Sequence, residues 1–143
     1  MTLPDARGAT AGYSGTPLPR KLGIKAGARV AVTRAPAGFA ALLGDLPDGV
    51  RIRPRVRGPL DLIVFFITRR AELERRIEAL RGALVTDGAL WIAWPKRASG
   101  VVTDVTEDVL RDIALPLGLV DNKVAAIDDT WSGLRLVIRR ELR

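Results

Sequence analysis

Basic side chains follow three of the segments whose composition predicts a strand. These cations are Arg34, Arg69, Arg70, Lys96 and Arg97, and Ser99 follows the last of them. In open α/β sheets, ligands bind outside the carboxyl ends of the strands, so these residues are expected to share one rim. Cations there, together with the backbone donors of the helices that start at the same edge, suit phosphate, a nucleotide or an acidic peptide. The alternative is that the loops of an arginine-rich protein simply carry arginine.

A glycine-rich arm over residues 12–27 precedes the first predicted strand. Pro17 and Pro19 forbid a long helix there, so we expect an ordered arm with a helical turn near residues 20–22. Tyr13 and Ser14 lie in this arm and are candidates for a lid over the strand ends; a purely structural role for them is equally open.

A second basic feature is an alternating ladder. Its cations are Arg51, Arg53, Arg55 and Arg57. Period-two alternation predicts an extended segment with one charged face, and charged edges guard against edge-to-edge aggregation. Contact with a nucleic-acid backbone is the functional alternative. Aromatic residues make up only 5% of the chain, which leaves no clustered platform for stacking bases.

The composition excludes several kinds of catalysis. The chain has no Cys and no His, so a thiol nucleophile, an imidazole base and a zinc site built on either are ruled out. Asp128 and Asp129 beside Trp131 fit hydrogen bonding in a turn better than an acid pair. Trp91 and Trp94 fit core packing better than ligand stacking. We therefore predict no catalytic residue and no metal site.

The chain of 143 residues has a net charge of +7 and an apolar fraction of 48%, enough for one core. Residues 1–11 are predicted to be a flexible tail, and residues 12–143 a single α/β domain. The tail lacks the apolar stretch of a signal peptide, and no segment is long enough to span a bilayer. We expect a cytoplasmic protein that does not bind membranes.

Strands and helices alternate along the sequence. Apolar runs predict strands at 29–33, 60–67 and 89–94, and a turn at Asp87-Gly88 precedes the last of these. Pro54 favours a strand over 50–53 followed by a coil, although an antiparallel hairpin with the next strand is the alternative. Apolar stripes at helical spacing predict helices over 69–84 and 104–117, and Gly44 at the position of a C-cap glycine predicts a short helix over 37–43. Strands at 123–127 and 134–139, joined by a six-residue link, predict a closing antiparallel hairpin.

This order predicts a three-layer, Rossmann-like α/β fold with a mostly parallel sheet. The segment 22–30, with the later strand–helix units and the hairpin, resembles class I S-adenosylmethionine-dependent methyltransferases. The resemblance covers about residues 20–140. It implies that the last strand is antiparallel and inserted beside 89–94, and that part of the family's sheet is missing.

A closer resemblance links the chain to a small bacterial family known only as a domain of unknown function. The segments that carry it are 12–18 (GYSGTPL), 91–96 (WIAWPK) and 130–137 (TWSGLRLV). This family brings no established activity with it.

The cofactor motif of the methyltransferases is not present. That family holds its cofactor with a glycine-rich turn after the first strand and an acidic residue after the second. Here the first turn is 33–38 (TRAPAG), which is not glycine-rich. Arg53 stands at the end of the second strand in place of the acidic residue, and its positive charge disfavours the cationic sulfonium group of the cofactor. We therefore expect no cofactor and a non-catalytic domain whose partner is an anionic small molecule or an acidic protein. A divergent methyltransferase and a nucleic-acid-associated protein are the alternatives, and a homodimer through an edge strand is a further expectation.

Overall fold

The computed structural model describes residues 15–143. The predicted tail 1–11 and the lid candidates Tyr13 and Ser14 lie outside the described residues. The strands are β1 (Arg29–Thr33), β2 (Arg51–Arg53), β3 (Leu60–Phe66), β4 (Leu84–Pro95), β5 (Leu119–Ala126) and β6 (Trp131–Ile138). The helices are α2 (Leu18–Leu22), α3 (Phe39–Leu43), α4 (Arg70–Ala83) and α5 (Glu107–Ala114), with 3-10 turns η1 (Arg97–Ser99), η2 (Leu115–Leu117) and η3 (Arg140–Leu142).

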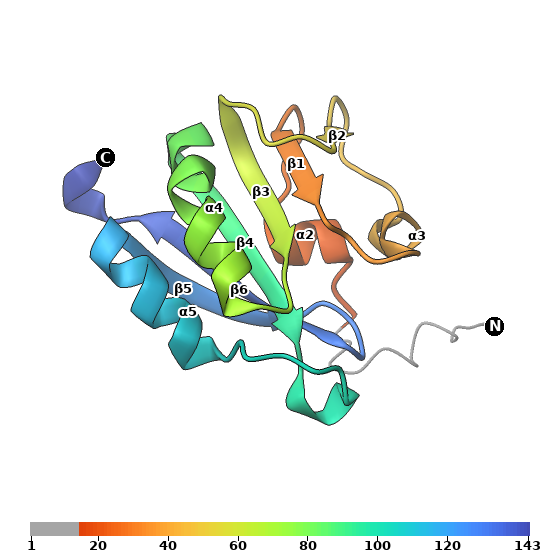
Figure 1. The fold of residues 1–143 in the computed structure, drawn as a ribbon. Helices are drawn as coiled ribbons and strands as arrows, with labels where there is room; N and C mark the ends of the chain where they lie inside the picture. Colours follow the sequence, from red (N-terminus) through yellow and green to blue (C-terminus); the bar gives the residue numbers. More distant parts are fainter. Residues whose placement is uncertain (1–14) are drawn as a thin grey trace.

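The strands form one sheet in the order β2-β1-β3-β4-β6-β5 (Figure 1). The first four of these are parallel, while β6 runs antiparallel to both β4 and β5. The predicted mostly parallel sheet with a closing antiparallel hairpin is therefore confirmed. The last strand lies beside β4, as the methyltransferase resemblance implied.

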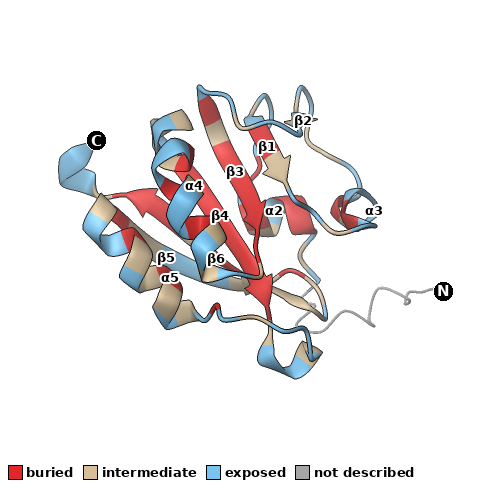
Figure 2. Cartoon of the chain, viewed as in Figure 1, coloured by how far each residue is buried: buried red, intermediate tan, exposed pale blue. Residues whose placement is uncertain are grey.

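Helices cover both faces of the sheet. In Figure 1, α4 and α5 lie in front of it, and α2 lies behind it. Each face has its own apolar cluster: Ile63, Phe65 and Leu73 belong to the cluster under α4 and α5, and Val64 and Trp91 to the cluster under α2 and α3. Figure 2 shows the central strands almost entirely buried between these layers. Strand β3 is apolar nearly throughout because both of its faces are covered.

Strand β2 ends at Arg53 and runs parallel to β1, so the hairpin alternative for this segment is excluded. The chain then returns as a coil on the α4 side of the sheet. Val56 packs against the core there, and a Cβ on Gly58 would lie 2.7 Å from the carbonyl oxygen of Ala83. With three residues, β2 forms a short edge, and pairing of this edge with a second copy stays a prediction.

The turn predicted at Asp87-Gly88 is wrong, because β4 is continuous from Leu84 to Pro95. The pairing with β3 instead shifts between Leu60 and Leu62, and this irregularity takes up the extra residues. A Cβ on Gly88 would lie 3.1 Å from the carbonyl oxygen of Asp61. Glycine at this position therefore favours the close approach of two strands and does not form a turn.

Trp91 and Trp94 are core residues, as predicted. Both are buried, and they point to opposite faces of β4. The Trp91 indole N–H donates to the carbonyl oxygen of Leu22 at 2.9 Å, which fixes α2 to the sheet. Within residues 15–143, no helix is long and apolar enough to cross a bilayer.

Candidate functional site

Strands β1, β3 and β4 end at the same edge of the sheet, because they are parallel neighbours in register. Arg34 follows β1, Arg69 comes three residues after β3, and Lys96 follows β4. The polypeptide thus brings the predicted cations to one rim. Their side chains, however, point in different directions and contact different parts of the protein.

Arg34 turns toward α4. Its guanidinium forms an ion pair with Glu72 and lies 5.9 Å from the centroid of the Phe65 ring. The residue adopts a left-handed backbone conformation, with φ 64°, which is uncommon for a side chain with a Cβ. Partial burial raises the pKa of Glu72, but hydrogen bonds from Arg34 and from the Thr68 amide outweigh it, so this pKa lies below its ordinary value. Glu72 is therefore ionised at neutral pH and compensates the charge of Arg34.

Arg70 is also compensated. Its side chain pairs with Glu74 at 3.1 Å, and its backbone N–H donates to a carboxylate oxygen of Asp104 at 2.7 Å. The Thr103 hydroxyl donates to the carbonyl oxygen of Thr68 at 2.6 Å. The loop after β4 is thereby fastened to the start of α4, and Asp104 occupies a backbone donor that an anionic ligand would otherwise take.

Lys96 points toward the hairpin end. Its ammonium group donates to the carbonyl oxygen of Asp128 at 2.7 Å. Ser99 closes the η1 turn, since its hydroxyl donates to the carbonyl oxygen of Lys96 and accepts from the amide of Val101. The Asp128 carboxylate accepts hydrogen bonds from the backbone amides of Thr130 and Trp131, as predicted for a turn.

Arg69 and Arg97 are the free cations of this rim. Both are exposed, and neither side chain makes a hydrogen bond or ion pair within residues 15–143. The rim therefore combines two uncompensated guanidinium groups, one ammonium group on a neutral carbonyl, and two arginines already paired with carboxylates.

The positions that bind the cofactor in methyltransferases carry no suitable groups here. Next to the turn after β1 lies an apolar groove of about 400 Å³, which Ala35, Pro36, Phe39, Ile52 and Pro54 help to line. None of its lining residues has a charged or hydroxyl side chain. Strand β2 ends in the exposed Arg53, without a carboxylate for ribose hydroxyls. The residues present do not fit the cofactor in the way the family binds it.

The arginine ladder is divided between two elements. Arg51 and Arg53 lie exposed on the edge strand β2, with Arg29 beside Arg51 on β1, while Arg55 and Arg57 lie exposed on the coil that follows. Arg29 itself is paired with Asp61 at 3.0 Å. In the part of the chain that the structure describes, no group of acidic residues is placed to hold a metal ion.

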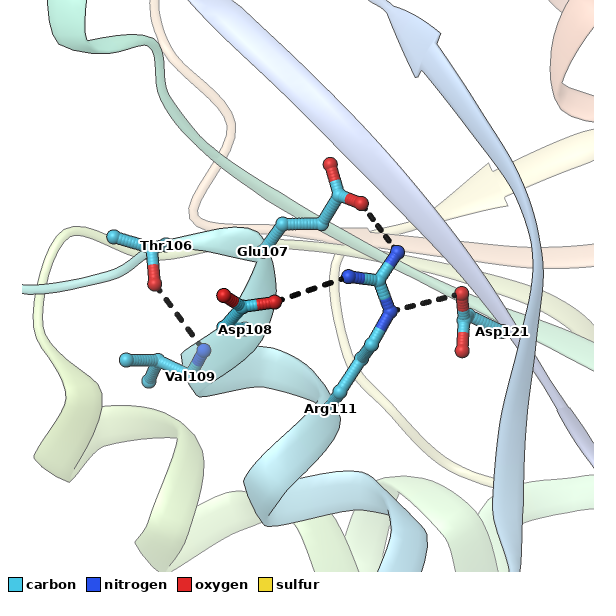
Figure 3. A network of polar contacts seen from close by, with 6 residues as sticks. All are labelled: Thr106, Glu107, Asp108, Val109, Arg111 and Asp121. Carbon is cyan, nitrogen blue, oxygen red and sulfur yellow. Dashed lines mark hydrogen bonds and ion pairs between the residues drawn. The ribbon is translucent and has the colours of Figure 1, made fainter.

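An ion-pair network joins α5 to β5 (Figure 3). The Arg111 guanidinium contacts Glu107 and Asp108 on its own helix and Asp121 on β5 at 3.1 Å. The Thr106 hydroxyl caps the helix by accepting from the Val109 amide at 3.2 Å. The network holds the carboxylate of Asp121 on the α5 face of the sheet.

Sequence reasoning missed a second group of cations, which lies on the face of the sheet that α2 covers. A groove of about 240 Å³ lies between α2 and the β5–β6 hairpin, and its basic lining residues are Arg20, Lys21, Lys123 and Arg135. Arg20 and Lys21 are neighbours in the sequence, but Lys123 lies 102 residues after Lys21, and the four residues belong to no motif. Only the pairing of the hairpin and the seating of α2 bring them together.

This topology and helix arrangement define the fold of class I S-adenosylmethionine-dependent methyltransferases. The sequence matches no family model and no curated protein. Among solved structures, the chain is similar to a SAM-dependent methyltransferase from Aquifex aeolicus, with a TM-score of 0.60 and 14% identity over 83% of this chain and 87% of that one.

Two further structures show the same similarity. The fibrillarin of Aeropyrum pernix, solved with bound S-adenosyl-L-methionine, has a TM-score of 0.57 and 15% identity over 80% of this chain and 68% of that one. A ribosomal protein L11 methylase from Lactobacillus delbrueckii subsp. bulgaricus has a TM-score of 0.56 and 16% identity over 86% of this chain and 76% of that one. At these identities the similarity concerns the fold.

Proposed function

We propose that this chain is a non-catalytic methyltransferase-like domain that binds an anionic ligand, or an acidic partner protein, at the rim formed by the strand ends. The observation that carries the proposal is the state of Arg69 and Arg97, two exposed guanidinium groups without partners in residues 15–143. The proposal includes membership of the uncharacterised bacterial family that the sequence resembles.

The cofactor positions support the non-catalytic part of the proposal. A cationic sulfonium would meet the exposed Arg53 at the end of β2, where the family offers a carboxylate, and the turn after β1 lacks the family's glycine-rich sequence. Repulsion between like charges opposes its binding at this rim. The apolar groove beside Pro36 offers no hydrogen-bonding side chain to a ribose or to an amino-acid carboxylate. A divergent methyltransferase would need to bind its cofactor with other residues.

A matched pair of ligands tests this proposal. ATP and S-adenosylmethionine share an adenosine group but differ in charge, so thermal unfolding with each separates anion binding from cofactor binding. We expect ATP to raise the unfolding temperature and S-adenosylmethionine to leave it unchanged. The ATP effect should fall when Arg69 and Arg97 are changed to Gln and persist in the control variant Arg140→Gln, whose exposed cation lies in η3. Stabilisation by S-adenosylmethionine alone would refute the proposal.

A further inference from the structure

We propose that the groove between α2 and the β5–β6 hairpin is a binding site for a phosphate group, distinct from the part of the rim that carries Arg69 and Arg97. Its lining residues are Arg20, Lys21, Leu22, Gly23, Asn122, Lys123 and Arg135, four of which are basic and none acidic. The proposal does not depend on the function proposed for the rim.

A β-bulge creates this concentration of charge. Asp121 lies opposite Leu136 on β6 and Lys123 lies opposite Arg135, so Asn122 is the additional residue. Successive residues on β6 point to opposite faces, and the bulge therefore sends Asp121 and Lys123 to opposite faces as well. Without the bulge, the two side chains would share a face, and the carboxylate would compensate the lysine.

The contacts agree with this separation of charges. Asp121 pairs with Arg111 on the α5 face (Figure 3), whereas the Arg135 guanidinium donates to the neutral carboxamide oxygen of Asn122 at 3.2 Å. The Lys123 ammonium group donates to the backbone carbonyl of Lys21 at 2.8 Å. Each of these two cations is thus held by a neutral acceptor, and its charge remains available to an anion.

Lys21 and Lys96 extend the positive charge toward the hairpin end. Their ammonium groups donate to the carbonyl oxygens of Ala126 and Asp128, two residues apart. Burial lowers the pKa of Lys21 below its ordinary value, and repulsion from Lys123 and Lys96 lowers it further. Burial also lowers the pKa of Arg135. A bound anion would relieve this repulsion.

The size and lining of the groove indicate the class of ligand. A volume of about 240 Å³ lies below the roughly 300–1,000 Å³ of pockets that enclose drug-sized ligands, and Leu22 is its one large apolar lining residue. It suits a compact anion rather than a base or a ring system. A phosphate dianion offers several strong acceptor oxygens to the donors of Lys21, Lys123 and Arg135. Free phosphate and the phosphate of a monoester share this chemistry.

Nuclear magnetic resonance titration of the full ¹⁵N-labelled chain tests the site. The two probes are inorganic phosphate and glucose 6-phosphate at constant ionic strength, which distinguish the free ion from a monoester. We expect saturable shifts of the Gly23 and Asn122 amides with at least one probe. Lys123→Gln should weaken binding about tenfold or more, the usual effect of losing a charge-assisted hydrogen bond.

The control is Arg75→Gln, which removes one exposed positive charge from α4 without touching the groove. Equal weakening by Lys123→Gln and Arg75→Gln would show non-specific attraction and overturn the proposal. So would shifts confined to the rim, or an absence of saturation with both probes. Should Lys123→Gln fail to fold, Asn122→Asp provides a second variant, because it adds a negative charge beside Arg135 and should abolish binding while the fold persists.

Discussion

Replacing Trp91 by Phe should destabilise the protein by about 2–4 kcal/mol, through the loss of one buried hydrogen bond and of part of a packed ring. Trp91 and Leu22 are both fully buried, and the indole N–H donates to the Leu22 carbonyl at 2.9 Å. Leaving that carbonyl without its partner costs about 1–3 kcal/mol. The void left by the smaller ring adds about 1 kcal/mol.

Equilibrium unfolding in urea measures this effect, with an unchanged m-value showing that the unfolded state is unaffected. The matched control is Trp94→Phe, the same substitution on the same strand. Trp94 is 8% exposed, and its indole makes no hydrogen bond within residues 15–143, so we expect only the packing loss of about 1 kcal/mol. Equal destabilisation by the two variants would refute the argument that the Trp91 bond fixes α2 to the sheet.

Two other predictions concern packing and pH. Gly133→Ala should destabilise the protein by about 1–3 kcal/mol in the same assay, because the new Cβ would lie 2.9 Å from the buried ring of Trp91; an unchanged midpoint would contradict this. The hydrogen bond from the Arg29 side chain lowers the pKa of Asp61 in the folded protein. The pair therefore stabilises the fold above the pKa of Asp61 in the unfolded chain, about 3.9, and this stabilisation is lost as the pH falls through the lower pKa of the folded protein. Asp61→Asn should therefore lower stability at neutral pH, and its difference from wild type should shrink in acid; a difference independent of pH would exclude this assignment.

The sequence predicted most of the architecture because its apolar patterns are strong. The runs at β3 and β4 are buried on both faces, and the stripe on α4 packs Leu73 and Ile77 into the core. The predicted end of β2 near Arg53 is confirmed, since Pro54 cannot continue the ladder of hydrogen bonds. The turn at Asp87-Gly88 was the main error. An Asp-Gly pair often forms a turn, but here both residues lie within β4, and Gly88 lies in close contact with β3.

The candidate site was harder to predict, because charge compensation depends on contacts between distant residues. Placement of the cations after successive strands follows from the topology. Pairing of Arg34 with Glu72, or the contact of Lys96 with the Asp128 carbonyl, requires the conformations of the loops. The groove at Lys123 and Arg135 depends on a bulge at Asn122, and nothing in the alternation of the segment 119–126 marks that bulge.

Direct calorimetric titration with S-adenosylmethionine tests the central claim that this methyltransferase-like fold does not bind the cofactor of its structural neighbours. The account predicts no saturable heat with S-adenosylmethionine or with its demethylated product, S-adenosylhomocysteine. A one-to-one isotherm with either compound, abolished by substitutions in the turn after β1, would contradict it.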